Sequence, residues 1–188
     1  DQATARLVYQ ASHDALTGLI NRRGLMESLK RAQARALKDG ASLAVGLVDI
    51  DNFKRVNDQW GHAIGDEVLR CVGGHLQAHA RRVAGDQAVA GRYGGEEFLV
   101  LLPGIGGATA RARLDAMRTG VGAAGAALGI EGLAVTASIG LAWANRSDPA
   151  LESIHDVQQL ADKAMYEAKR SGRNQVALFT PETGQRGA

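Results

Sequence analysis

Two runs of apolar residues flank a short polar turn near the middle of the chain, at positions 88–90 and 98–102. This pattern predicts a β-hairpin with Gly94 and Gly95 at its tip. Glycine has no side chain and tolerates positive φ, so a ligand could approach the backbone closely there. Glu96 and Glu97 follow directly. Such a tip is typical either of a plain solvated turn or of a site for a divalent cation and a phosphate-bearing ligand.

A second apolar run, residues 43–48, is continuous rather than alternating and predicts a strand buried on both faces. It ends in Asp49-Ile50-Asp51, which places two carboxylates at the carboxyl end of a central strand. Active sites of α/β sheets open at that end. An acid just before a helix is also a common cap. We expect Asp51 to cap the following helix and Asp49 to be functional.

Apolar residues recur at helical spacing in much of the remaining chain, which predicts five helices joined by short connections. The first begins after the N-cap Asn21 and ends near Gly40. The others cover residues 52–60, 64–79, 107–128 and 157–170, with a loop at 81–87. Gly120, Gly122 and Gly125 lie in the fourth helix, so we expect it to be the least stable, or broken.

Strands at 133–141 and 175–179 complete the pattern, the former with one half-polar face, and Asp148-Pro149 breaks the chain between them. The order is helix, strand, two helices, hairpin, helix, strand, helix, strand. A hairpin within an alternating α/β pattern indicates a mixed sheet flanked by helices, of split βαβ or ferredoxin-like type. We expect a helical connector at 1–12, one domain at 13–180 and a flexible tail at 181–188.

Composition excludes several classes of function. Cys71 is the only cysteine, so neither an internal disulfide nor a cysteine metal cage is possible, and a reducing cytoplasm is the simplest location. A net charge of +2 is too small to indicate nucleic acid or a membrane surface as partner, so we expect neither. No apolar run is long enough to cross a membrane, and no signal peptide is visible. The sequence begins at Asp1 rather than at methionine, so we expect a fragment of a longer chain.

Five segments in order resemble the GGDEF family, which comprises bacterial diguanylate cyclases that condense two GTP into cyclic di-GMP. They are DALTGLINRR at 14–23, DIDNFKRVND at 49–58, GHAIGD at 61–66, RYGGEEF at 92–98 and AKRSGRN at 168–174. The resemblance spans residues 12–180. Glu96 stands where the family name has aspartate, a known alternative that keeps the carboxylate. The resemblance implies a palm-like fold, related to that of nucleotide polymerases, with a catalytic hairpin.

The resemblance also implies a metal site and a catalytic centre at the two predicted strand ends. Asp49 and Glu96 would bind Mg²⁺, or Mn²⁺ in its place, with the Ile50 carbonyl completing the shell. Mg²⁺ favours one or two carboxylates plus phosphate oxygens, and two such ions can hold the attacking and leaving oxygens of an in-line displacement. Glu97 would either accept the 3′-hydroxyl proton or hold the second ion, and the sequence leaves both roles open.

A GTP site is implied next to these acids. Asn57 and Asp66 would hydrogen-bond the guanine edge, and a pair of acceptors there disfavours adenine. Lys54 would face the reacting phosphoryl group and offset its charge. The remaining contacts to the nucleotide would come from Phe53, His62, the Gly94-Gly95 backbone, Lys169 and Arg173.

Some of these residues also suit ordinary structural roles. Lys169 and Arg173 lie where cations complement the dipole at the carboxyl end of a helix, although beside the other segments we favour phosphate binding. A structural hydrogen bond explains His62 as well as ligand contact does. Tyr93 is assigned to packing.

The stretch before the hairpin departs from the family. Many members carry Arg-x-x-Asp there, where cyclic di-GMP binds and inhibits. Here Arg82 and Asp86 are one residue too far apart. We therefore expect the primary inhibitory product site to be absent before Gly94.

Three hypotheses follow. The first is an active cyclase in which two domains face each other as a homodimer, under an N-terminal sensor or receiver domain. It would be cytoplasmic, whether or not the whole chain is anchored in a membrane. The second is a non-catalytic GTP-binding sensory module, which the intact Asp49, Glu96 and Lys54 argue against. The third is a cyclase for another purine, which the Asn57 and Asp66 pair disfavours.

Overall fold

The structure is a computed structural model, and it describes residues 9–144 and 154–178. Its centre is a five-stranded sheet in the order β2-β3-β1-β4-β5. Neighbouring strands are antiparallel except β4 and β5, which run parallel. The predicted mixed sheet with a hairpin, β2-β3, is therefore confirmed. The strands are β1 (Leu43–Ile50), β2 (Val89–Arg92), β3 (Glu97–Pro103), β4 (Ala137–Ala144) and β5 (Val176–Leu178).

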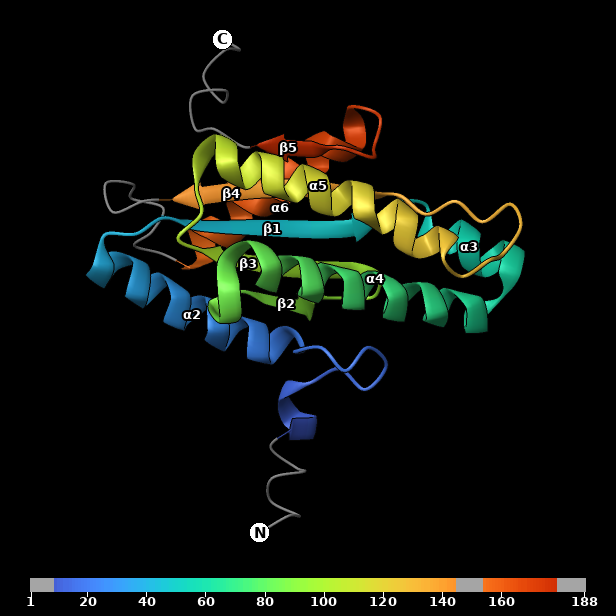
Figure 1. Ribbon diagram of the computed structural model, residues 1–188, viewed down its shortest axis with the longest axis horizontal. Helices are drawn as coiled ribbons and strands as arrows, with labels where there is room; N and C mark the ends of the chain where they lie inside the picture. The colour runs from blue at the N-terminus through green and yellow to red at the C-terminus, as the bar shows by residue number, and fades with distance from the viewer. Residues whose placement is uncertain (1–8, 145–153, 179–188) are drawn as a thin grey trace.

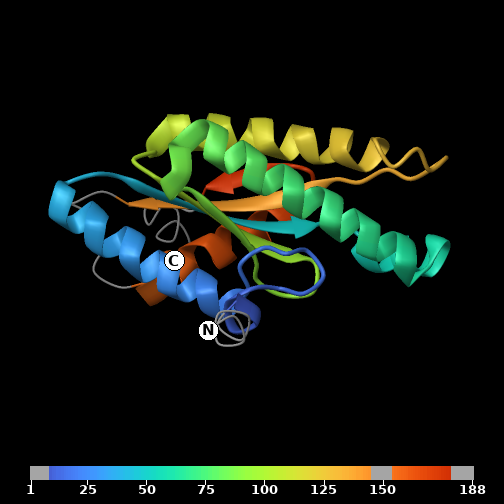
Figure 2. The ribbon, with the colours of Figure 1, turned by 60° about the horizontal axis from the view of Figure 1, so that its bottom comes forward.

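Helices cover both faces of the sheet (Figures 1 and 2). On one face lie α4 (His62–Ala84) and α5 (Gly107–Ala126), and on the other lie α2 (Arg22–Asp39) and α6 (Ile154–Arg170). The short helix α3 (Phe53–Trp60) follows the carboxyl end of β1 and leads into α4 (Figure 1). Each face has its own apolar core, which includes Val72 and Met117 on the first side and Leu29 and Ala161 on the second.

β1 occupies the centre of the sheet because its sequence is apolar on both faces. All eight of its residues are buried. Ala44 and Val48 belong to the core beneath α4 and α5, whereas Val45 and Leu47 belong to the core beneath α2 and α6. Side chains alternate along a strand, so Asp49 continues the second set and points toward α6.

The strand predicted at 133–141 is wrong in its bounds and in its half-polar face. β4 begins only at Ala137, and seven of its eight residues are buried. Thr136 lies outside the strand. The Ser138 hydroxyl can be buried without cost to the fold because it donates to Asp51 Oδ1 at 2.7 Å. A polar residue in this strand therefore marks an internal hydrogen bond rather than a solvent-facing side.

α5 is continuous over 20 residues, so the break expected from its glycines does not occur. Two of the three glycines, Gly120 and Gly125, lie where neighbouring residues approach closely. A Cβ on Gly120 would overlap the His75 ring, and one on Gly125 would lie 2.7 Å from the Val135 side chain. These contacts require residues without a side chain, and they outweigh the low helix propensity of glycine.

The loop predicted at 81–87 is also wrong. α4 continues to Ala84, and a 3-10 turn, Gly85–Gln87, follows it. Val83 and Ala84 pack against the apolar core, which extends the helix beyond the predicted stripe.

The predicted caps of α2 are confirmed: Asn21 Oδ1 accepts from the Gly24 amide at 3.0 Å, and Gly40 has φ 66°. Residues 9–12 of the expected connector are helical. The expected break at Asp148-Pro149 and the expected tail at 181–188 lie outside the described residues. None of the helices described is long and apolar enough to cross a membrane.

Candidate active site

Two strand ends bring three carboxylates together. β1 and β3 are neighbours, and their register sets Asp49 opposite Glu97. The Ile50 amide donates to the Glu96 carbonyl at 3.2 Å, which holds the end of β1 against the hairpin. Asp49 is only 5 % exposed, whereas Glu96 and Glu97 are half-buried. The backbone register therefore gathers the acids that the sequence singles out.

Burial and mutual repulsion act on these acids. Burial raises the pKa of Asp49 above its usual 3.8, Lys169 opposes that rise and Glu96 adds to it. Burial likewise raises the pKa of Glu97 above 4.5, and repulsion from Asp49 is the next cause. Asp162 on α6 raises the Glu97 pKa further. Several carboxylates gathered in a partly desolvated site favour the binding of a cation there.

Lys169 supplies one positive charge at this point. It lies in the last turn of α6, and its Nζ is 2.8 Å from Asp49 Oδ2. Asp49 is the acid of β1 that points toward α6, so the pair links the sheet to that helix. The carboxylate site thus already holds an ammonium group in contact with its most buried acid.

The site does not form a complete metal cage. Within 9–144 and 154–178, no group of three or more His, Cys, Asp or Glu side chains is arranged to hold a metal ion. Asp49, Glu96 and the Ile50 carbonyl offer oxygen ligands only. Such a partial oxygen shell fits Mg²⁺, which takes its remaining ligands from phosphate oxygens and water.

The predicted guanine contacts lie where α3 packs against α4. The side chain of Asn57 lies over Gly65, so closely that a Cβ on Gly65 would overlap Asn57 Oδ1 and lie 3.3 Å from Phe53 Cζ. Phe53 is buried, and Asp66 is half-buried one residue after Gly65. The glycine therefore lets the Asn57 amide and the Phe53 ring of α3 pack directly against the start of α4.

Three residues predicted to contact the nucleotide have solvent-exposed side chains. Lys54 is 89 % exposed and pairs with Asp58 at 2.8 Å, one turn along α3. Asp58 raises the pKa of this ammonium. His62 at the start of α4 and Arg173 after α6 are also exposed. None of the three has a described contact with the carboxylates, so their roles stay predictions.

The family model described as "Diguanylate cyclase, GGDEF domain" matches residues 11–175 of this chain. The chain belongs to the GGDEF domain family. Diguanylate cyclase DgcP of Pseudomonas aeruginosa is 38 % identical over 169 residues, which cover 90 % of this chain and 24 % of that protein. Diguanylate cyclase DgcM of Escherichia coli is 38 % identical over 172 residues, which cover 91 % of this chain and 39 % of that protein. This GGDEF domain thus spans less than half the length of these relatives.

Solved structures share the fold of this GGDEF domain. The coiled coil and GGDEF domain of DgcB from Caulobacter crescentus, in complex with c-di-GMP, superposes with a TM-score of 0.82 at 33 % identity, covering 95 % of this chain and 91 % of that chain. The active GGEEF domain of a diguanylate cyclase from Vibrio cholerae gives a TM-score of 0.71 at 32 % identity, covering 86 % and 98 %.

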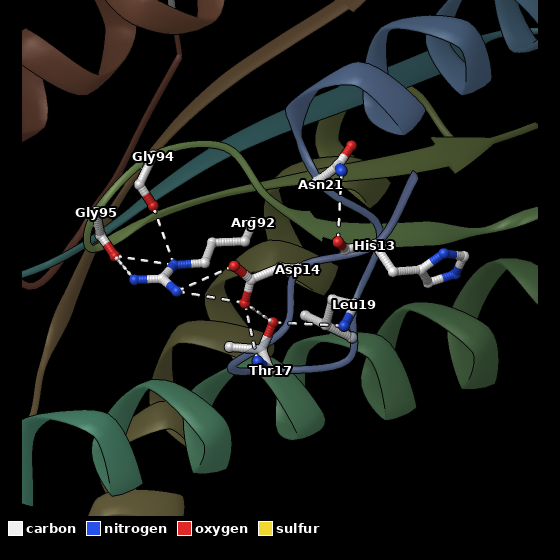
Figure 3. Close-up of polar contacts among 8 residues, drawn as sticks. All are labelled: His13, Asp14, Thr17, Leu19, Asn21, Arg92, Gly94 and Gly95. Atoms are coloured by element: carbon white, nitrogen blue, oxygen red, sulfur yellow. Dashed lines mark hydrogen bonds and ion pairs between the residues drawn. The ribbon is translucent and has the colours of Figure 1, made fainter. Parts of the chain in front are cut away.

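Arg92 holds the tip of the hairpin in this GGDEF domain, a role that the sequence did not reveal. Figure 3 shows its guanidinium between the tip and the N-terminal loop, residues 13–21. Nε donates to the Gly94 carbonyl at 3.2 Å and to the Gly95 carbonyl at 3.1 Å, and Nη2 donates to the Gly95 carbonyl at 2.8 Å. Nη1 donates to both Asp14 carboxylate oxygens at 3.1 and 3.3 Å. The tip next to Glu96 is therefore fixed from a segment almost eighty residues earlier.

Asp14 stays ionised in this arrangement. Burial acts to raise its pKa, but hydrogen bonds from Thr17 and the charge of Arg92 outweigh burial, so the pKa lies below the usual 3.8. The Thr17 amide and hydroxyl donate to Asp14 at 2.8 and 2.7 Å. The ion pair is therefore complete at any neutral pH, and Arg92 keeps its charged partner.

Asp51 does not cap α3, which corrects the sequence-based prediction. Asn52 occupies the N-cap position with φ 53°, and it makes no capping hydrogen bond through its side chain. The Asp51 carboxylate instead turns toward β4 and toward the loop after α6. Asp51 does not cap the neighbouring helix because its carboxylate accepts hydrogen bonds from groups that are distant in sequence.

Proposed function

We propose that this GGDEF domain is a diguanylate cyclase, which condenses two GTP into cyclic di-GMP and releases two pyrophosphates. The main support is the register of β1 and β3, which sets Asp49 opposite Glu97, together with the contact between Asp49 and Lys169. It supplies two acids for a divalent cation and one ammonium for a phosphate at the same point. The relatives and solved neighbours that are named diguanylate cyclases support the same activity.

Asp49, Glu96 and the Ile50 carbonyl would hold Mg²⁺, or Mn²⁺, and Glu97 could take part in holding a second ion. The bound ions would supply Lewis-acid stabilisation of the phosphate oxygens and of the departing pyrophosphate. Burial raises the pKa of Asp49 and of Glu97. Because water screens buried charges weakly, a divalent cation bound there would be attracted strongly to these two carboxylates.

The chain's own residues orient the nucleotide. Asn57 and Asp66 accept hydrogen bonds from the guanine edge above Phe53, with His62 nearby, and the Gly94-Gly95 backbone lies against the nucleotide. Lys169, Arg173 and Lys54 offset the charge of the triphosphate. For Lys54 this requires the side chain to leave Asp58, with which it now pairs.

The reaction joins two bound nucleotides. The 3′-oxygen of one GTP attacks the α-phosphorus of the other, and the bond from that phosphorus to the bridging oxygen of pyrophosphate breaks. Glu97 either accepts the proton of the 3′-hydroxyl or ligates the second ion, and a raised pKa makes its carboxylate the stronger base for the first role. Both 3′-oxygens react in this way, which closes the ring.

One domain holds one GTP, so two domains must face each other. Homodimerisation, at least transient, is therefore part of the proposal. A sensor or receiver domain at the N-terminal side of a longer, cytoplasmic protein would control the encounter.

Incubation with GTP and Mg²⁺, followed by chromatographic separation of the nucleotides, tests the proposal. Cyclic di-GMP should accumulate, its formation per domain should rise with protein concentration because two domains must meet, and EDTA should stop it. ATP in place of GTP is the control and should give no cyclic product. If a concentrated or covalently dimerised sample binds GTP but forms no cyclic di-GMP, the domain is instead a GTP-binding regulatory module, as the solvent-facing Lys54 would then explain.

Product inhibition offers a second test. Arg82 Nη2 forms a hydrogen bond with His79 Nδ1 at 2.9 Å on α4, and Asp86 lies in the following 3-10 turn. We expect low micromolar cyclic di-GMP to leave the initial rate unchanged, because no Arg-x-x-Asp precedes the hairpin. A non-hydrolysable GTP analogue serves as the positive control for inhibition in the same assay. A rate that falls by half at low micromolar product would contradict the expectation.

A further inference from the structure

The carboxylate of Asp51 is buried and fully engaged. The residue is 7 % exposed. Its Oδ1 accepts from the Ser138 hydroxyl at 2.7 Å, and its Oδ2 accepts from the Thr136 hydroxyl at 2.7 Å and from the Asn174 amide at 3.0 Å. Three donors leave little room for a metal ion at these oxygens. Asp51 therefore binds protein groups from two other segments rather than a ligand.

One of those segments is the loop after α6, and its backbone is strained. Arg173 has φ 65° and Asn174 has φ 46°, and both are non-glycine residues in the left-handed region. Such conformations persist only where surrounding contacts hold them, and they concentrate at functional sites. Here Asn174 is held from two sides, since Arg118 Nη1 donates to its Oδ1 at 2.5 Å while Asp51 accepts from its amide.

The same loop connects to the candidate active site at its other end. Lys169, at the end of α6, contacts Asp49 at 2.8 Å. Asp49 lies at the end of β1 and Asp51 follows it two residues later, so the two acids bind the last turn of α6, four residues before Arg173, and the residue directly after Arg173. Arg173 itself donates its amide to the Ala168 carbonyl at 3.0 Å, and its side chain is exposed. The backbone of Arg173 is thus fixed, while its guanidinium is exposed and has no described partner among residues 9–144 and 154–178.

We propose that Asp51 is a positioning residue for the triphosphate of GTP. By holding the Asn174 amide, it fixes the strained backbone from which Arg173 reaches the phosphates, beside the Asp49 and Lys169 pair. The inference rests on the proposed function, since Arg173 has a phosphate to bind only when GTP occupies this site. It adds a residue whose oxygens touch neither metal nor nucleotide, and which acts through the loop alone.

Binding of GTP and of guanosine, measured by calorimetry or competition, separates the phosphate contacts from the guanine contacts. Asp51→Ala removes every acceptor and should weaken GTP binding about 10-fold or more, the range seen for residues that orient ligand-binding groups. Guanosine affinity should not change. Asp51→Asn should restore most of the GTP affinity, because its oxygen can still accept from Asn174 and its amide can donate to the Ser138 hydroxyl.

A double-mutant cycle with Arg173→Ala supplies the readout that a merely structural role would not move. Once Arg173 is removed, Asp51→Ala should cost no further GTP affinity, because the two residues act in series. Leu76→Val, in the core under α4, is the control for a general loss of stability and should affect neither ligand. If Asp51→Ala does not fold, Arg118→Ala releases Asn174 from the surface side and should weaken GTP alone, to a smaller degree.

Equal weakening of GTP and guanosine by Asp51→Ala, or additive effects in the cycle, would overturn the inference. The proposed function is separable from it. A wild-type protein that binds GTP but forms no cyclic di-GMP would overturn the cyclase activity alone, because the role of Asp51 is measured by binding.

Discussion

Glu97→Gln will bind GTP and form almost no cyclic di-GMP, with a loss of activity of about 10²–10⁴-fold, as expected for a group that moves a proton or holds a catalytic ion. Glu97 stands opposite Asp49 in the sheet, and a Cβ on Gly94 would lie 3.0 Å from its Oε2. Its carboxylate therefore lies over the hairpin tip, where the nucleotide is expected. Product formation and GTP binding are measured on the same sample.

The same substitution should leave the domain as stable as before, or more stable. The pKa of Glu97 is raised by burial and by Asp49, Asp162 and Glu96, so its charge opposes folding at neutral pH. Glutamine removes that charge and keeps the shape. Glu67→Gln is the matched control, since Glu67 pairs with Arg70 on the exposed side of α4 and should change neither activity nor melting temperature. Retention of more than a tenth of the wild-type rate by Glu97→Gln would contradict the assignment.

Arg92→Lys is expected to lower kcat by about 10²-fold, the effect of a displacement of about 1 Å at a reacting group. Lysine keeps the charge but cannot donate to the Gly94 carbonyl, the Gly95 carbonyl and the Asp14 carboxylate at once, as arginine does. The hairpin tip would then lose its defined position beside Glu96. Steady-state kinetics with GTP provide the measurement.

Arg70→Lys is the control for this second substitution, because Arg70 makes only an exposed pair with Glu67 on its own helix. Asp14→Asn should produce a smaller loss of activity in the same direction, since Asn keeps one acceptor for Arg92 and for Thr17. If Arg92→Lys retains activity within a factor of two while Asp14→Asn does the same, the link between the N-terminal loop and the tip does not control catalysis.

Features that depend on neighbouring residues could be predicted from the sequence, whereas features that depend on distant partners could not. The strand at 43–48, the hairpin and the caps Asn21 and Gly40 each follow from a few adjacent residues, and the structure confirms them. The roles of Asp51 and Arg92 do not, because their partners lie 123 and 78 positions away. Local rules favour a cap for an acid before a helix, and here three hydrogen-bond donors from distant segments overrule them.

The helix with three glycines illustrates the same limit. Propensity predicts a weak or broken α5, and the glycines are unfavourable for an isolated helix. The role of Gly120 and Gly125 becomes visible only when His75 and Val135 are placed against them. The acids of the site, in contrast, could be grouped in advance through the family resemblance, and the pairing of β1 with β3 sets Asp49 opposite Glu97.

The contact between Lys169 and Asp49 has a consequence for the order in which ligands bind. An ion arriving alone would have to displace an ammonium that already satisfies the most buried acid, so its affinity for the empty domain should be low. A nucleotide offers that ammonium a new partner in its phosphates and brings oxygen ligands for the ion at the same time. Metal and GTP should consequently bind as a cooperative pair, each raising the affinity of the domain for the other.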